Sequence, residues 1–167
     1  MLSQNGSYVL PYQILAYANF LSTHWEAAAQ YFLTLVDLDP AHASQYTFLA
    51  GVSYYRIGAY DQSLLYLTQI QDSTLLTDVY RYQLLSLLAL QDGDGAVRVW
   101  QKLLGQSDIA DSDFQFFFEQ FFFSPYRSGQ PFLLYSQNTQ LATLYTQSCA
   151  QSFSGQQDVC LYGDIAQ

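Results

Sequence analysis

The side chains best suited to catalysis are few in this sequence and lie far apart. It has two histidines, His24 and His42, and no H-x3-H, H-E-x-x-H or C-x2-C spacing that could bind a metal ion. No G-x-S-x-G nucleophile motif and no glycine-rich phosphate loop is present. Catalysis needs a nucleophile and a base that can meet, or a metal site. We therefore expect a protein that is not an enzyme and that holds no metal and no cofactor.

The segment Asp92-Gly93-Asp94-Gly95 shares its oxygen ligands and turn glycines with calcium loops. It lacks the remainder of an EF-hand loop, including the terminal glutamate that binds calcium through both carboxylate oxygens. We therefore interpret it as a turn between two helices.

Cys149 and Cys160 are the only cysteines, and the polar segment between them is flexible enough to close a loop. An even number of cysteines in a segment rich in Gln, Ser and Gly favours a disulfide, which would place the chain in an oxidising compartment. We predict that the two cysteines pair. Two unpaired thiols are the alternative.

The composition indicates a folded, acidic protein with few charges. Of 167 residues, 50% are hydrophobic and 11% are charged, and the net charge is -9. Such a chain can bury a core, and its charge disfavours nucleic acids and anionic membranes as partners. No apolar run reaches the length of a membrane span, and residues 1–8 lack the basic and apolar regions of a signal peptide.

The acidity comes from 12 Asp against only 2 Glu, and Lys102 is the single lysine. Cytosolic helical proteins usually carry Glu and Lys on their outer faces. The composition and the cysteines therefore favour an exported, periplasmic or cell-surface location. A compositional habit of the source organism would explain the same numbers.

Apolar residues recur at helical spacing along most of the chain, and turn residues interrupt them at short intervals. The pattern predicts an all-α fold with helices near 9–21, 24–38, 42–57, 60–71, 76–91, 94–105, 112–123 and 131–151. Residues 1–8 form an N-terminal extension. The helix near 112–123 carries seven phenylalanines, so we expect it to be buried on several sides or to contact a partner.

The predicted helices follow one another in pairs, and a small residue recurs at a nearly constant offset in the second helix of each pair. Ala28, Ser63 and Ala96 are separated by 35 and 33 residues. Other residues fit the same frame: Ala16, Trp25, Phe32, Leu35 and Pro40 in the first unit, Gly51, Tyr54, Gly58, Tyr60, Leu67 and Ile70 in the second, Trp100 and Leu103 in the third. This pattern resembles the tetratricopeptide repeat (TPR), whose period is 34 residues.

The resemblance covers residues 9–106 and implies a right-handed α-solenoid of three helix pairs. An atypical C-terminal pair, the Phe-rich and capping helices of 107–151, would follow it, and 152–167 would be a tail or a disulfide-tied loop. A generic antiparallel helical bundle is the alternative fold. It needs no glycine at a fixed helix crossing.

In the TPR family the first helices of successive pairs line a concave groove, and the resemblance places eight residues there: Tyr17, Phe20, Phe48, Val52, Tyr55, Arg56, Arg81 and Leu85. The groove has no lysine, which disfavours the carboxylate clamp of the family's chaperone-tail binders. Its aromatic and aliphatic character suits an extended peptide or a protein helix, with Arg56 bonding an acceptor on the ligand. We expect a non-enzymatic scaffold for a protein or peptide partner, possible also as a homodimer.

The chain is also similar to the class II chaperones of type III secretion, which are acidic, of similar length, and built of three such repeats. Those chaperones hold translocator proteins in an apolar groove, and this reading would place the chain in the cytoplasm. The sequence departs from them in its few Glu and Lys, its two C-terminal cysteines and its Phe-rich helix.

Overall fold

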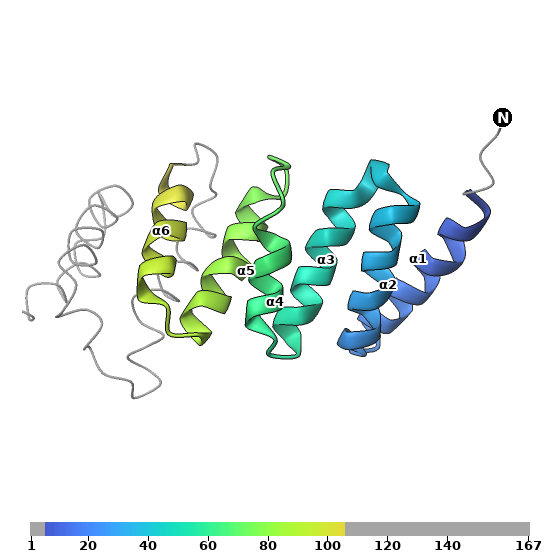
Figure 1. Cartoon of the computed structure of the whole chain (residues 1–167), viewed down its shortest axis with the longest axis horizontal. Coiled ribbons are helices and arrows are strands. Elements are labelled where there is room, and N and C mark those ends of the chain that lie inside the picture. Colours follow the sequence, from blue (N-terminus) through green and yellow to red (C-terminus); the bar gives the residue numbers. More distant parts are fainter. Residues whose placement is uncertain (1–5, 106–167) are drawn as a thin grey trace, which may run out of the picture. The chain divides into compact units, whose positions relative to one another are not determined.

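The computed structural model describes residues 6–105, and every regular element in that range is a helix. The elements are α1 (Gly6–Leu21), α2 (Trp25–Leu38), the short 3-10 helix η1 (Pro40–His42), α3 (Ala43–Arg56), α4 (Tyr60–Leu67), α5 (Leu76–Ala89) and α6 (Gly93–Leu104) (Figure 1). The prediction of an all-α chain is therefore confirmed over these residues.

No helix among them is both long enough and apolar enough to span a bilayer. The predicted segments 107–151 and 152–167 lie outside the described range.

The chain divides into two compact units, Met1–Leu90 and Gln91–Gln167, so α1 to α5 belong to the first unit and α6 to the second. Within the first unit each helix packs against the next one in sequence, and α3 also contacts α5. In the predicted repeat frame, α1, α3 and α5 correspond to first helices and α2 and α4 to second helices.

One turn geometry occurs three times along the chain. The turns that precede α2, α4 and α6 each contain a residue with a left-handed backbone: Thr23 (φ 62°), Gly58 (φ 80°) and Gln91 (φ 60°). These residues are 35 and 33 positions apart, the same offsets as the small residues of the second helices. At Gly58 the left-handed conformation is free of steric cost, whereas Thr23 is β-branched and strained there.

The helix starts that follow these turns also repeat. The N-cap residues have φ -83° in all three cases: His24, Ala59 and Asp92. The amide four residues further on donates a hydrogen bond of 3.0 Å to the N-cap carbonyl each time, from Ala28, Ser63 and Ala96. At the third start the Asp92 carboxylate also accepts a hydrogen bond of 2.8 Å from the Gly95 amide, so the Asp-Gly-Asp-Gly segment begins α6.

The helix α4 ends at Leu67, four residues earlier than predicted. The Thr68 amide still donates to the Leu64 carbonyl, but the Gln69 amide donates to the Tyr66 carbonyl, three residues back instead of four. Two polar side chains also bond carbonyls of the last turn. Thr68 Oγ1 donates to the Leu64 carbonyl at 2.9 Å, and Gln69 Nε2 donates to the Leu65 carbonyl at 2.9 Å. Hydroxyl and amide side chains compete with the backbone in this way, which the apolar pattern does not show.

Gly51 marks the closest approach of α3 and α4. A Cβ atom added there would lie 2.8 Å from both Cγ and Cδ2 of Leu67 and 3.6 Å from the Ser63 carbonyl oxygen. Leu67 is fully buried, so its side chain has little room to move. The small residue therefore leaves room for the Leu67 side chain of α4 against α3.

The first unit contains two apolar clusters. One joins α1, α2 and α3 and consists of Ala16, Ala28, Phe32, Leu35, Tyr46 and Ala50. The other joins α4 and α5 through Leu67, Ile70 and Val79, with Phe48 of α3 packed against it. The two clusters position the aromatic side chains that the sequence singled out.

Candidate functional site

The two predicted groove residues of α1 pack against a buried ring of α2. The Tyr17 ring meets the Phe32 ring edge-on at 5.3 Å, and the Phe20 ring meets it at 5.9 Å. Phe32 is fully buried, while Tyr17 keeps 37% of its surface exposed. Phe20 also contacts the Trp25 ring at 5.0 Å. These contacts make Phe20 largely a packing residue and leave Tyr17 at the surface.

The predicted aromatic residues of α3 meet at Tyr82 of α5. The Phe48 and Tyr82 ring centroids are 5.9 Å apart, and those of Tyr55 and Tyr82 are 5.4 Å apart. Tyr60, at the start of α4, adds a ring 5.7 Å from Tyr55. All four rings are partly exposed, and we call them the Tyr82 cluster. The cluster brings α3, α4 and α5 together in one aromatic surface.

Sequence analysis missed Tyr60 and Tyr82 as members of this surface. Tyr60 was assigned only to the start of a second helix. Tyr82 directly follows the predicted residue Arg81 and was not among the predicted groove residues. The signal that could have found it is the run Tyr80-Arg81-Tyr82, which puts an aromatic ring on either side of Arg81.

Val52 and Leu85 are less available than predicted. Val52 is only 3% exposed, so it belongs to the core beneath α3 and offers almost no surface to a ligand. Leu85 is partly buried. The usable surface is therefore aromatic rather than aliphatic.

The two predicted arginines are the only basic residues between 1 and 90. The exposed Arg56 guanidinium lies over the Trp25 ring, 5.8 Å from its centroid, and Arg81 lies 3.6 Å from the Asp78 carboxylate. Burial raises the pKa of the Tyr55 hydroxyl, the neighbouring Tyr60 adds to the rise, and the positive charge of Arg56 opposes it. Positive charge thus lies beside the Tyr82 cluster in an otherwise acidic unit.

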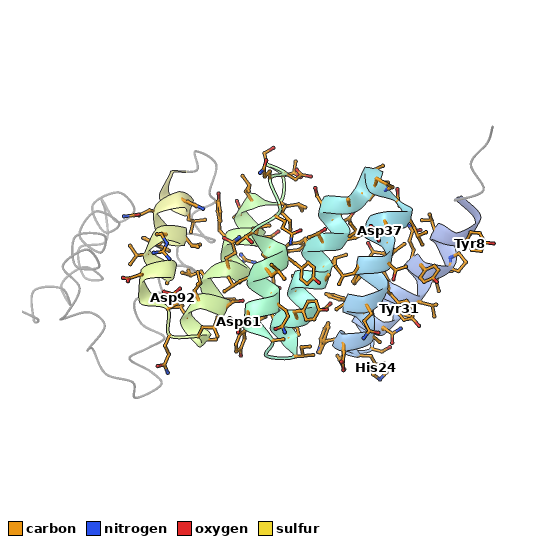
Figure 2. The ribbon with its side chains drawn as sticks, viewed as in Figure 1. Tyr8, His24, Tyr31, Asp37, Asp61 and Asp92 are labelled. Carbon is orange, nitrogen blue, oxygen red and sulfur yellow. The ribbon has the colours of Figure 1, made fainter. Side chains whose placement is uncertain are left out.

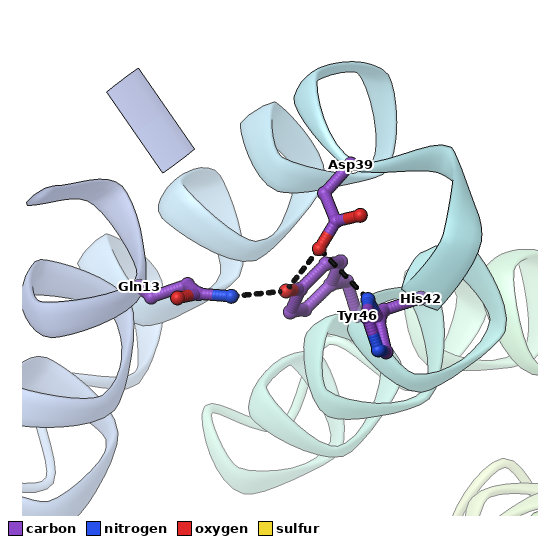
Figure 3. Close-up of polar contacts among 4 residues, drawn as sticks. All are labelled: Gln13, Asp39, His42 and Tyr46. Carbon is purple, nitrogen blue, oxygen red and sulfur yellow. Dashed lines mark hydrogen bonds and ion pairs between the residues drawn. The ribbon is translucent and has the colours of Figure 1, made fainter. Parts of the chain in front are cut away.

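A separate polar network surrounds Tyr46. Gln13 Nε2 of α1 donates to the Tyr46 hydroxyl at 2.7 Å, and that hydroxyl donates to Asp39 Oδ2 at 2.9 Å (Figure 3). His42 Nδ1 lies 2.8 Å from the same carboxylate oxygen. Because Gln13, Asp39 and Tyr46 come from α1, the end of α2 and α3, the network ties three elements together.

No family model matches the sequence, and no curated protein is significantly similar to it. What the chain does must therefore be argued from the geometry above.

Both histidines lie at the N-caps of helices. His42 is the N-cap of α3 and pairs with Asp39, while His24 is the exposed N-cap of α2. Among residues 6–105 no three His, Cys, Asp or Glu side chains gather as a metal site would require. The predicted disulfide of Cys149 and Cys160 lies outside that range.

The pKa shifts in this network describe a structural role. Burial works against ionisation of Asp39, but hydrogen bonds from Tyr46 and His42 and the charge of His42 outweigh it and lower the pKa of this carboxyl. Burial raises the pKa of Tyr46, the hydrogen bond from Gln13 opposes that rise, and the one to Asp39 adds to it. Ionised Asp39 is therefore stabilised in the folded chain.

We expect the free energy of unfolding to fall in acid because of Asp39. A lowered pKa in the folded state stabilises the protein above the unfolded value, near pH 4, and this contribution disappears as the pH falls through the folded value. Asp39→Asn should therefore be less stable than the parent at neutral pH, and the difference should shrink below about pH 4. Urea unfolding at a series of pH values measures this. Asp37→Asn, an exposed position on α2, is the control. A difference that stays constant with pH would contradict the assignment.

Proposed function

We propose that this chain is a helical-repeat scaffold, similar to TPR proteins, that binds a peptide or a protein helix over the Tyr82 cluster. The proposal includes a solenoid of three helix pairs. The recurring turn supports it, because three turns with one backbone geometry follow one another at offsets of 35 and 33 residues. A generic bundle has no need for such repetition.

The observation that carries the proposal is the Tyr82 cluster itself. It presents partly exposed rings from α3 and α5, the first helices of two successive pairs, joined at 5.4 Å between Tyr55 and Tyr82. Tyrosine combines a large apolar ring with a hydroxyl and loses little conformational entropy on binding, which makes it frequent at binding hot spots. A peptide could place apolar side chains on these rings and its backbone groups on the hydroxyls.

Arg56 would supply the polar part of the interaction. Its guanidinium is held over Trp25 at 5.8 Å and remains exposed. The N–H groups of a guanidinium point outward in its own plane, so a guanidinium that lies over an aromatic ring can still donate them to a ligand. A backbone carbonyl or a carboxylate of the ligand is the acceptor that fits this charge.

Selection of a displayed library of linear peptides against the full chain tests the proposal. We expect selected peptides to lose binding by about thirtyfold or more to a Tyr55→Ala/Tyr82→Ala variant, the effect of removing a hot spot of about 2 kcal/mol. Phe48→Ala is a poorer probe, since Phe48 packs against the cluster of Leu67, Ile70 and Val79.

The matched control is Tyr54→Ala. The Tyr54 ring stacks on Tyr66 at 5.3 Å with an interplanar angle of 9°, and neither ring belongs to the Tyr82 cluster. This variant should keep the affinity of the parent, and circular dichroism should show both variants folded. No enriched peptide, or equal loss in both variants, would reject the Tyr82 cluster as the binding surface.

A further inference from the structure

The outward half of α1 is apolar, unlike the outer face of an ordinary surface helix. Six of its large hydrophobic side chains are exposed: Tyr8 by 63%, Leu10 by 61%, Ile14 by 60%, Leu15 by 42%, Tyr17 by 37% and Leu21 by 81%. We call these six residues the α1 face. Tyr8 extends from the α1 end of the first unit (Figure 2). No charged residue occurs in the 16 residues of α1.

Two polar side chains of α1, Gln13 and Asn19, are partly buried. Gln13 bonds Tyr46, and the Asn19 amide bonds the Leu15 carbonyl of its own helix at 2.7 Å. α1 therefore lacks the polar outer face that an ordinary surface helix has opposite its apolar inner face. A helix that is apolar around its circumference is normally covered on more than one side.

Comparison with α3 shows which cover is missing. With the offset of 35 residues between the first two pairs, Tyr46 and Ala50 of α3 correspond to Pro11 and Leu15 of α1. The α3 residues are buried in the cluster that α2 shares, and Tyr46 stacks on Phe32 of α2 at 6.4 Å. Pro11 and Leu15 are exposed. α1 thus carries on its surface the positions that α3 buries under a preceding helix.

We propose that the α1 face is covered by the α1 face of a second copy of this chain. In a twofold contact the same patch lies on both sides, so charged residues of one sign within the patch would repel their copies. The chain carries a net charge of -9, and two copies repel each other wherever acidic residues meet. α1 holds no charged residue of either sign, whereas α2, α4 and α5 hold acidic residues and α3 holds Arg56, so an α1–α1 contact brings no like charges of these helices together.

The spacing and the area of the face fit a helix pair. Leu10, Ile14, Tyr17 and Leu21 follow i, i+4, i+7 and i+11, which forms one stripe along a helix as in the seam of a coiled coil. Six large side chains that are about half exposed offer roughly 500 Å2 per copy, or roughly 1,000 Å2 for two, the lower limit of a specific interface. We therefore expect an antiparallel α1–α1 pair that dissociates on dilution.

Sedimentation equilibrium of the full chain over a range of concentrations tests this pairing. We expect the parent to reach twice the monomer mass, and Ile14→Glu/Leu21→Glu and Ile14→Lys/Leu21→Lys each to remain monomeric, with dissociation constants raised at least tenfold. An equal mixture of the two variants should recover the dimer, because opposite charges then meet across the contact. Circular dichroism should match the parent, since both positions are exposed, and thermal unfolding should match at concentrations low enough for the parent to be monomeric.

Leu65→Glu on α4 is the control, because Leu65 is 58% exposed outside the α1 face and should leave the dimer unchanged. A parent that stays monomeric at its highest soluble concentration would overturn the proposal and assign the α1 face to another partner or to another segment of the same chain. A dimer that survives the charged variants of α1, or a mixture that fails to re-form it, would overturn it equally. None of these outcomes depends on peptide binding at the Tyr82 cluster.

Discussion

Replacing Gly51 by leucine should lower the free energy of unfolding by about 1–3 kcal/mol, the usual cost of overpacking a core. The reason is the helix crossing. Even a Cβ atom at this position would lie 2.8 Å from two atoms of the fully buried Leu67 side chain. The larger side chain must push α3 and α4 apart, and that opens the cluster around Leu67. Urea unfolding followed by circular dichroism measures the change.

Gly51→Ala is the sharper version of the same experiment, because two effects compete in it. In an exposed helix the change would stabilise by about 1 kcal/mol through helix propensity. Here we expect the contact with Leu67 to outweigh that gain, so the variant should be less stable than the parent. Ala89→Leu, at an exposed position on α5, is the control for added volume and should be nearly neutral. A stabilised Gly51→Ala would show that α3 and α4 do not approach as closely as 2.8 Å implies.

The helices and turns were predictable because their signals are local. Gly51, Gly58 and the small residues of the second helices are determined by nearby backbone geometry, and the structure shows that geometry repeated at Thr23, Gly58 and Gln91. The end of α4 was wrong for a reason that apolar spacing cannot reveal. The Gln69 side chain bonds the Leu65 carbonyl, while the Gln69 amide donates to the Tyr66 carbonyl.

The candidate site was predicted less well because side-chain exposure depends on how whole helices rotate. The step from Arg81 to Tyr82 turns a side chain by about 100° around the helix, which decides whether it faces α3. That rotation is determined by long-range packing of α5 against Phe48 and Leu67. The family frame names Arg81 and Leu85 on α5 and does not include Tyr82.

The orientation of α1 has the same explanation. Leu15 and Ala16 are adjacent in the sequence, yet Leu15 is 42% exposed while Ala16 is fully buried. The apolar residues of α1 are distributed around its whole circumference, so its sequence does not say which half faces inward. The choice is made by Ala16, the small residue that lies against α2 in the first cluster.

Removing the Phe32 ring should have the largest effect on stability. We expect Phe32→Ala to cost about 3–5 kcal/mol, the range found for phenylalanine truncation in a core. Phe32 is fully buried, and the rings of Tyr17, Phe20 and Tyr46 surround it at 5.3, 5.9 and 6.4 Å. Urea unfolding measures the cost, and Phe32→Leu, which keeps most of the volume, should lose much less.

Tyr31→Ala is the matched control, because this neighbouring ring is partly exposed and meets Tyr12 edge-on at 6.1 Å. Its loss should be well below that of Phe32→Ala.

The comparison also decides the role of the two α1 residues that the family pattern assigned to a groove. If Phe20 packs against Phe32 in the core beside Tyr17, the single change Phe20→Ala should destabilise the protein, as Phe32→Ala does. The free-energy cost of the double variant should then be smaller than the sum of the two single costs. Additive costs would separate Phe20 from the core and return it to the ligand surface.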